Sequence, residues 1–401
     1  MLADTDVLIV GAGQAGLAVS HELTVAGVDH VVVDRGRAGA SWYVRWDSFT
    51  LVTPNHTIRL PGGEYDGEDP GGYLTREGVI RHLRQYGGSF GAPIFEQAGV
   101  TSLEADDEGF VAETEGGVVR ARRVVACTGA YTRERRPAVL EQLPPGLPVI
   151  GSTSYRSPDS LPDGRVLVIG GGQTAGQLSE ELLLAGREVV LSAGRAPAMP
   201  RRVAGRDGID WLIDAHFFEQ TAADLPSSAA RLSPNPLVTG RSGGHDLNLR
   251  TLAVAGAQLI GHVLGVDGDR LVVADDLDDS IATGDEGWAQ ICGLIELTAA
   301  RLGMPRPHLP RMPERRVTPS PPPRLSDLAA VVVACGFRPD YRWIGIPGVV
   351  DELGLPLQVD GASTVVPGLS FVGVPWMRTR KSPLLLGVGD DAAVVAAQLA
   401  A

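Results

Sequence analysis

The sequence predicts an α/β protein that contains two nucleotide-binding units of the same design. One unit is "DVLIVGAGQAGLAVSHELTVAGVDHVVVDRG", residues 6–36, and the other is "GRVLVIGGGQTAGQLSEELLLAGREVVLSAGR", residues 164–195. In each, an apolar run typical of a buried parallel strand leads through a glycine turn into a helix, and a second apolar run follows. One G-x-G-x-x-G turn is weak evidence, but two complete strand–turn–helix–strand units favour a duplicated dinucleotide site.

The two units align at a constant offset. Gly11 and Gly170 both open a G-x-G turn, so the offset is 170 − 11 = 159. The same offset aligns Gly13 with Gly172, Gln14 with Gln173, and Gly27 with Gly186. The last pair stands where each helix should end, at a position that favours glycine.

Each residue of the turn has a physical task. The first glycine allows the tight turn, and the second lets the backbone approach a pyrophosphate. The helix N-terminus then offers unpaired N–H groups and the positive end of its dipole to the phosphates. The third position brings the helix close to the strand, and it is Gly16 in the first unit and Ala175, an accepted variant, in the second.

The units differ where the second strand ends. Asp34 lies about twenty residues after the first turn, where an acid accepts hydrogen bonds from a ribose 2′-hydroxyl. The same offset gives Ala193, which is flanked by Ser192 and Arg195. Arginine binds a 2′-phosphate that an acid would repel, so the first unit is predicted to hold an adenosine with a free ribose and the second NADPH. The alternative for Arg195 is a solvated surface residue.

The other elements are predicted in chain order from periodicity and turn residues. Between the units we expect an ordered aromatic loop, a helix, an antiparallel meander and a proline-rich connection, at residues 36–75, 76–86, 100–127 and 131–161. Residues 205–262 mix helical stretches with stretches that have no clear pattern. We then expect a hairpin, a helix, an extended connector, a buried strand and a strand–loop–helix tail, at residues 261–275, 284–303, 304–323, 329–341 and 369–400.

Composition excludes several classes of protein. The formal net charge of −13 argues against nucleic acid as a partner. The three cysteines form no C-x-x-C pair, so neither a redox dithiol nor a metal site is predicted. The first strand begins too soon after Met1 for a signal peptide, and no apolar run is long enough to span a bilayer. We therefore expect a cytoplasmic protein without a membrane partner; whether it forms a homodimer is open.

The chain resembles the flavoproteins with two dinucleotide-binding domains, and among them the flavin-dependent monooxygenases related to flavin-containing and Baeyer–Villiger monooxygenases. The resemblance covers nearly the whole chain. It is carried by both turns, by "GASWYVRWDSFTLVTPNHTIRLPG", by "ACTG" and "ACGFRPD", and by "GLSFVGVPWMRTRKSPLLLGVGDDAA". It implies two Rossmann-like domains: an FAD domain formed by residues 1–150 and 325–401, and an NADPH domain, residues 151–324, inserted into it.

The resemblance also implies roles for individual residues. FAD would be held by Gly11, Gly13, Gln14, Ala15, Gly16, Asp34, Arg35, Ser41, Trp42, Trp46, Val100, Cys127, Thr128, Gly129, Leu386 and Gly387. NADPH would be held by Gly170, Gly172, Gln173, Thr174, Ala175, Ser192 and Arg195. Asn55 matches an asparagine beside the reactive face of the flavin and would be catalytic; alternatively it is a turn residue after Pro54.

One departure from the family stands out. The family fingerprint between the domains is F-x-G-x-x-x-H-x-x-x-(Y/F), whereas "VIGSTSYRSP" has Tyr155 at the terminal aromatic position and Gly151 at the position of the histidine. The resemblance therefore leaves the type of oxygenation open.

The resemblance implies an NADPH-dependent monooxygenase that forms a C4a-(hydro)peroxyflavin from O2 and oxygenates a small organic substrate. The alternatives are an NADPH-dependent reductase that passes electrons to a quinone or a protein carrier, and a non-catalytic redox sensor. The roles of some polar residues are also open, between function and structure: His56, His245 with Asp246, Lys381, and the pair Arg201–Arg202.

Overall fold

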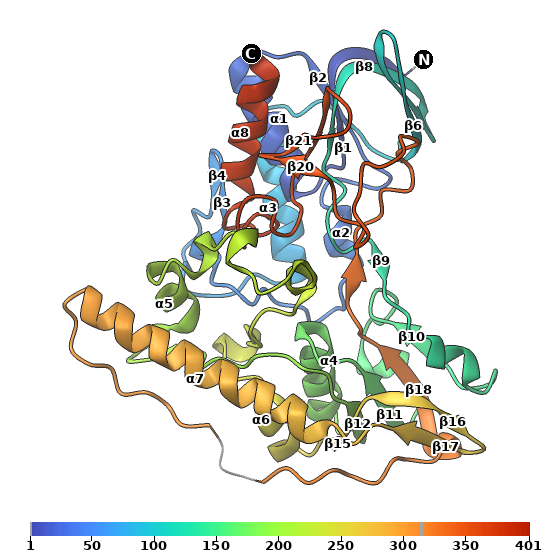
Figure 1. Cartoon of the computed structure of the whole chain (residues 1–401), viewed down its shortest axis with the longest axis vertical. Helices are drawn as coiled ribbons and strands as arrows, with labels where there is room; N and C mark the ends of the chain where they lie inside the picture. The colour runs from blue at the N-terminus through green and yellow to red at the C-terminus, as the bar shows by residue number, and fades with distance from the viewer. Residues whose placement is uncertain (1, 313–315) are drawn as a thin grey trace.

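Two parallel β-sheets organise the chain. The computed structural model describes residues 2–312 and 316–401. Figure 1 shows the first sheet in the upper part of the molecule, together with both chain ends, and the second sheet in the lower part. Because the chain leaves the upper part and returns to it, the second sheet is an insertion within the first domain, as the sequence predicts.

The first sheet has a parallel centre with the order β22-β8-β1-β2-β5 and antiparallel strands at its edges. Its strands are β1 Ala3–Val10, β2 His30–Val33, β5 Ile94–Phe95, β6 Val100–Asp106, β7 Gly109–Thr114, β8 Gly117–Ala126, β20 Gln358–Val359, β21 Ala362–Ser363 and β22 Leu369–Phe371. The helices of this domain are α1 Gln14–Ala26, α2 Ala40–Tyr43, α3 Arg76–Ser89 and α8 Val388–Ala400, and a short hairpin pairs β3 Arg59–Leu60 with β4 Gly63–Glu64.

The second sheet is entirely parallel, in the order β10-β18-β11-β12-β15. Its strands are β10 Val149–Gly151, β11 Arg165–Ile169, β12 Val189–Ser192, β15 Gln258–Ile260 and β18 Leu328–Val333. The helices are α4 Gln173–Leu184, α5 Gly208–Asp214, α6 Leu249–Val254 and α7 Leu277–Arg301, and two hairpins pair β13 Arg202–Val203 with β14 Arg206–Asp207 and β16 Val263–Asp267 with β17 Arg270–Val273.

The strand–turn–helix units form as the sequence predicts. The central strands are buried on both faces, with Val7, Leu8 and Ile9 at 0% exposure in β1, which explains their continuous apolar runs. Gly27 and Gly186 both take left-handed φ values, 70° and 77°, just past the ends of α1 and α4. The predicted helix, meander, hairpin and tail between and after the units are also confirmed.

Two predicted domain boundaries differ from the observed sheets. Both β10 and β18 pair within the second sheet, whereas the bounds implied by the resemblance place most of β10 and all of β18 in the FAD domain. An apolar run predicts a buried strand but does not indicate which sheet the strand joins. The pairing partners of β10 and β18 could therefore not be predicted from the sequence pattern. The predicted connector, residues 304–323, has no helix or strand where it is described; residues 313–315 lie outside the described part.

The two chain crossings between the domains pair with each other. β9 Arg133–Glu134 lies antiparallel to β19 Phe337–Arg338, with Glu134 opposite Phe337. Tyr131 and Phe337, one from each crossing, pack edge to face with ring centres 5.8 Å apart. The domains are therefore joined by a two-stranded ribbon instead of two independent linkers.

A buried polar network also holds the domains together. Arg201, at 1% exposure, is paired with Asp207 at 2.7 Å and donates to the phenol oxygen of Tyr73 and, at 2.6 Å, to the carbonyl of Val52. Tyr73 in turn donates to Asp207 at 2.6 Å, and burial followed by that hydrogen bond raises the pKa of Tyr73 to about 12. Because Tyr73 and Val52 belong to the first domain, a buried charge of the second domain has its partners in both.

We expect removal of the acid in this network to destabilise the protein strongly. Asp207→Ala leaves the buried Arg201 guanidinium uncompensated, so the free energy of unfolding should fall by about 3–5 kcal/mol. Asp207→Asn keeps the side-chain acceptor for the N–H of Ile209 at the start of α5, and separates the charge effect from loss of that cap.

The matched control is Asp214→Ala, because the Arg206–Asp214 pair lies nearby but each side chain is about one-third exposed. That change should cost less than about 1 kcal/mol. Chemical denaturation of the three variants tests the network, and equal losses for Asp207→Asn and Asp214→Ala would contradict its importance.

No described helix carries an apolar stretch sufficient to span a bilayer.

Candidate functional site

The N-termini of α1 and α4 are built alike and lack side-chain caps. Their N-cap residues are Gly13, with φ −83° and ψ −171°, and Gly172, with φ −87° and ψ −172°. Neither helix has a side-chain hydrogen bond to its first turn or an acidic residue within it, whereas Thr75 caps α3. Both helices therefore present unpaired N–H groups and an uncompensated positive dipole end, which suits a pyrophosphate.

The first glycine of each turn packs against a backbone carbonyl. A Cβ at Gly11, where φ is 110°, would lie 2.6 Å from the oxygen of Cys127, and one at Gly170, where φ is 145°, would lie 2.3 Å from the oxygen of Ala334. Cys127 and Ala334 are thus equivalent, as are Gly129 and Gly336 with φ 79° and 88°. The Ala–Cys dipeptides of the two crossings look alike in the sequence. In the structure they do not correspond, because Cys127 is equivalent to Ala334, the residue before Cys335.

The third position differs between the turns for a steric reason. A Cβ at Gly16 would lie 1.8 Å from the carbonyl oxygen of Gly11, so the first unit requires glycine. In the second unit Ala175 is fully buried and its methyl group fits. Alanine is therefore accepted at the third position of the second turn but not at that of the first.

A glutamine in each unit ties a distant segment across the start of its helix. Gln14 Nε2 donates to the carbonyl of Pro383 at 2.8 Å. Gln173 Nε2 donates to the carbonyl of Val238 and its Oε1 accepts from the N–H of that residue. We call residues 376–387 and 233–240 the closing segments, because each passes over one dinucleotide turn.

The residues around the first turn fit FAD. Asp34 accepts from the N–H of Ala12 at 2.7 Å and of Gly36 at 2.8 Å, which fixes its carboxylate beside the turn with further lone pairs for a ribose hydroxyl. Three buried polar atoms here have no partner among the described residues: Trp42 Nε1, Arg45 Nε and Thr128 Oγ1. Unpartnered buried donors are costly in a finished protein, so these three are available to a polar ligand.

The other residues assigned to FAD vary in exposure. Arg35 and Ser41 are exposed and Val100 is half-buried, whereas Cys127 is buried at the crossing. Trp46 is 3% exposed and packs edge to face on Phe49 with ring centres 5.1 Å apart, so it belongs to the core. Leu386 and Gly387 are buried just before α8, where the stem of Lys381 leaves no room for a Cβ at Gly387.

The end of β12 corrects one predicted NADPH contact. Ser192 is 2% exposed, and its hydroxyl donates to Gly261 at 3.1 Å and accepts from Val263 at 3.2 Å, so it serves the sheet edge instead of a ligand. Arg195 is 58% exposed and pairs with Asp279 at 2.8 Å. It is accessible to a 2′-phosphate, but a carboxylate competes for it.

A histidine that the sequence did not reveal lies beside the second turn. His262 Nδ1 is 2.6 Å from Asp276 Oδ2, and its Nε2 would be 3.5 Å from a Cβ at Gly194, which itself packs against Gly171. It lies 262 − 195 = 67 residues after Arg195 in a stretch with no motif, so only the parallel pairing of β12 with β15 brings it here.

Asn55 and His56 contact the loop that follows them. The amide of Asn55, which is 2% exposed, donates to the carbonyl of Asp69 at 2.9 Å and accepts from the N–H of Leu74 at 2.6 Å. His56 Nε2 lies 2.7 Å from Asp210 of α5, which adds a second link between the domains. These contacts favour a positioning role for both residues, and the catalytic role of Asn55 stays a prediction.

The remaining polar candidates have structural partners. His245 Nε2 lies 2.5 Å from Glu180, and that hydrogen bond raises the pKa of the imidazole. Lys381 pairs with Glu219 and Asp390, each at 2.8 Å. Arg201 is part of the buried network described above, while its exposed neighbour Arg202 donates to the carbonyl of Gly243 at 2.9 Å.

Glycine is required at position 151 because the carboxylate of Glu134 occupies the space beside it. A Cβ there would lie 2.0 Å from Glu134 Oε2. The other oxygen of Glu134 accepts from the hydroxyl of Ser152 at 3.0 Å and from the N–H and hydroxyl of Thr153 at 2.8 and 2.9 Å. A carboxylate from the connecting ribbon thus occupies the space beside the position where the resembled family has histidine.

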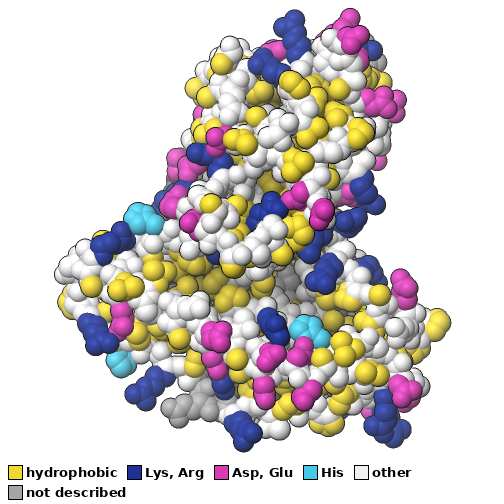
Figure 2. Space-filling view, viewed as in Figure 1, with side chains coloured by type: hydrophobic (Ala, Val, Ile, Leu, Met, Phe, Trp, Pro, Cys, Tyr) yellow, Lys and Arg dark blue, Asp and Glu magenta, His cyan; other side chains and the backbone are white. Residues whose placement is uncertain are grey.

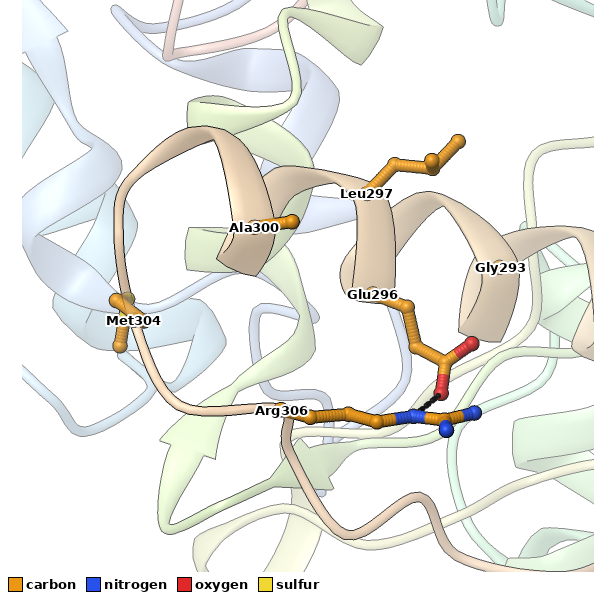
Figure 3. Close-up of a pocket in the computed structure, with 6 residues that line it drawn as sticks. All are labelled: Gly293, Glu296, Leu297, Ala300, Met304 and Arg306. Carbon is orange, nitrogen blue, oxygen red and sulfur yellow. Dashed lines mark hydrogen bonds and ion pairs between the residues drawn. The ribbon is translucent and has the colours of Figure 1, made fainter.

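One surface pocket lies away from both turns. It has a volume of about 550 Å³ and is lined by Gly293, Glu296, Leu297, Ala300, Met304 and Arg306 at the end of α7 (Figure 3). Leu297 is 71% exposed, and Arg306 pairs with Glu296 at 2.8 Å. By contrast, Figure 2 shows the surface hollowed between the upper and lower parts of the molecule, with hydrophobic side chains along the hollow.

Comparisons with known proteins agree with this geometry. Residues 8–203 match a family described as pyridine nucleotide-disulphide oxidoreductase. An uncharacterized CzcO-like oxidoreductase of Geobacillus kaustophilus is 29% identical over 395 residues, which cover 96% of each chain. The probable indole-3-pyruvate monooxygenase YUCCA4 of Arabidopsis thaliana is 31% identical over 241 residues, 58% of this chain and 54% of that protein.

A solved structure extends the likeness to the whole fold. The flavin-containing monooxygenase from Stenotrophomonas maltophilia superposes with a TM-score of 0.69 at 18% identity, over 99% of this chain and 98% of that one. This likeness confirms the predicted fold. The predicted resemblance is confirmed by the family match together with the monooxygenase relative, and the family match supports a pyridine nucleotide as one cofactor.

The steric relation between Gly151 and Glu134 predicts a non-additive pair of substitutions. Gly151→Ala should destabilise the protein by about 1–3 kcal/mol, because its methyl group collides with the Glu134 carboxylate. In the Glu134→Ala background the same change should cost much less. A double-mutant cycle by thermal or chemical denaturation measures the coupling, and additive losses would refute the collision.

We expect substitutions at Arg195 and at its partner Asp279 to change the preference for NADPH over NADH. Arg195→Ala should weaken NADPH binding about tenfold, or about 1.4 kcal/mol, and leave NADH binding unchanged. Asp279→Ala frees the guanidinium and should strengthen NADPH binding instead. Fluorescence titration of both nucleotides checks the pair of variants. Equal effects of Arg195→Ala on the two nucleotides would place the 2′-phosphate elsewhere.

Proposed function

We propose that this chain, which is related to flavin-dependent monooxygenases among the flavoproteins with two dinucleotide-binding domains, is an NADPH-dependent monooxygenase that acts on a small organic substrate. The observation that carries the proposal is the pair of uncapped helix starts, in register at an offset of 159 and different at Asp34 and Ala193. A hydride donor and a flavin acceptor require two such sites in one chain. Bound FAD, reduced by NADPH, supplies the oxygen chemistry.

The chain's own residues bind and orient these groups. The α1 start and Asp34 hold the pyrophosphate and ribose of FAD, and Trp42 and Thr128 offer their unpartnered donors to the same cofactor. The α4 start holds NADPH, with Arg195 at its 2′-phosphate. Asn55 holds the loop of residues 69–74 in place, so that its influence on the flavin face is exerted through position.

An apolar cluster under the first closing segment supports chemistry that must exclude water. Leu386 belongs to one buried apolar cluster with residues of the inserted domain: Met199, Val203, Ile209, Trp211, Leu212, Phe218, Val238, Ile291, Ile295 and Ala299. The segment that the resemblance places at the flavin is thus backed by hydrocarbon instead of solvent. A reactive oxygen species decays in water, so this environment favours oxygenation over simple electron transfer.

The thiols do not favour disulfide reduction. Cys127 and Cys292 are buried, Cys335 is half-buried, and all three are free. Burial raises the pKa of each thiol, to about 11 for Cys292. Disulfide exchange requires a thiolate, so these thiols are poor nucleophiles at neutral pH. The relatives named as monooxygenases give the better analogy for this chain.

The proposal predicts coupled consumption of NADPH and oxygen. The purified, FAD-loaded protein should oxidise NADPH in air, and a productive substrate should lower the hydrogen peroxide formed per NADPH while one oxygen atom appears in the product. An oxygen electrode, a peroxide assay and mass spectrometry with labelled O2 measure this balance. NADPH oxidation that is supported by a quinone without oxygen uptake would instead establish a reductase.

A further inference from the structure

Arg380 is held between two aromatic rings at the junction of the domains. Its guanidinium carbon lies 4.2 Å from the ring centre of Phe217 and 4.6 Å from that of Trp376. Its Nε donates to Gln220 Oε1 at 3.1 Å and its Nη1 to Asn235 Oδ1 at 3.0 Å. The side chain is therefore fixed in one orientation by contacts from both domains.

This guanidinium has no acidic partner. Among the described residues no carboxylate oxygen lies within 4.0 Å of it, and its two hydrogen bonds go to neutral amides. Its neighbours are different: Arg378 pairs with Asp360 and Asp391, and Lys381 with Glu219 and Asp390. Desolvation also lowers the pKa of Arg380 to about 10. Two of its five N–H groups are used, and Nη2 makes no hydrogen bond within the described chain.

The position of Arg380 relates it to both dinucleotide turns. It lies three residues before Pro383, which Gln14 holds over the first turn, and its partner Asn235 lies three residues before Val238, which Gln173 holds over the second. The two closing segments therefore meet at Arg380. Trp376 has φ 58°, an uncommon backbone conformation for a bulky side chain.

We propose that Arg380 anchors the carboxylate of the substrate, which is then an organic acid with an apolar body. This inference rests on the proposed monooxygenase function and specifies its substrate class. The unused N–H groups of the guanidinium, those of Nη2 among them, can donate charge-assisted hydrogen bonds to a carboxylate, and the rings of Phe217 and Trp376 offer apolar surface beside it. The pyrophosphate of NADPH is the other anion nearby, but the uncapped start of α4 already supplies its donors.

The test compares matched acids and amides. The probes are 3-phenylpropionate and indole-3-acetate with their primary amides, added to the FAD-loaded protein and followed by the shift of thermal midpoint and by flavin fluorescence. We expect the acids to bind and the amides to bind at least about tenfold more weakly. Arg380→Gln should remove this preference, Arg380→Lys should restore only part of it, and the Kd for NADPH should stay unchanged.

Arg378→Gln is the control, because that arginine is two residues away and already paired with acids. It should keep the preference for acids. The proposal is overturned if acids and amides bind alike, if neither binds, or if Arg380→Gln weakens NADPH binding instead. Binding is measured without turnover. A protein that consumes NADPH and oxygen but does not bind carboxylates would therefore contradict only the proposed role of Arg380. A protein that binds the acids but does not oxidise NADPH would contradict the proposed monooxygenase function.

Discussion

The buried pairing of Arg201 with Asp207 and Tyr73 is the interaction on which the site geometry depends. Charge buried to this degree is tolerated only when every partner is in place, and here the partners come from both domains. The network therefore opposes any movement that separates the segment around Val52 from Arg201, which directly precedes the β13–β14 hairpin. Together with the β9–β19 ribbon, it holds the two domains in place relative to each other.

The repeated unit explains both the likeness and the division of labour between the domains. The same helix start, the same glutamine and the same close approach to a crossing carbonyl recur, so each turn can hold a pyrophosphate and carry a closing segment. The differences are at the strand ends, where Asp34 receives two backbone N–H groups and Arg195 stands at the surface. Two units of the same design can therefore bind different nucleotides, because the second strand is followed by an acid in one unit and by an arginine in the other.

Sequence patterns predicted what depends on local chemistry. Glycine spacing and apolar runs determine the turn and its flanking strands, so Gly11, Gly170 and the ends of both helices were predictable. Patterns could not predict pairings between distant segments. The sheet that β18 joins, the use of the Ser192 hydroxyl by the sheet edge and the burial of Arg201 all depend on partners far away in the chain. Arg380 is separated from Gln220 by 160 residues, so its aromatic and amide surroundings had no signal in the sequence.

The central claim is that one chain brings a hydride donor in its second unit to a flavin in its first. Anaerobic mixing of the FAD-loaded protein with NADPH, followed by flavin absorbance, tests it most directly. The account predicts rapid bleaching of the flavin band. It also predicts that Gly172→Val, which introduces a branched side chain where NADPH must approach the α4 start, slows bleaching while FAD stays bound. A protein that binds no FAD, or whose bound FAD is not reduced by NADPH, would contradict the account.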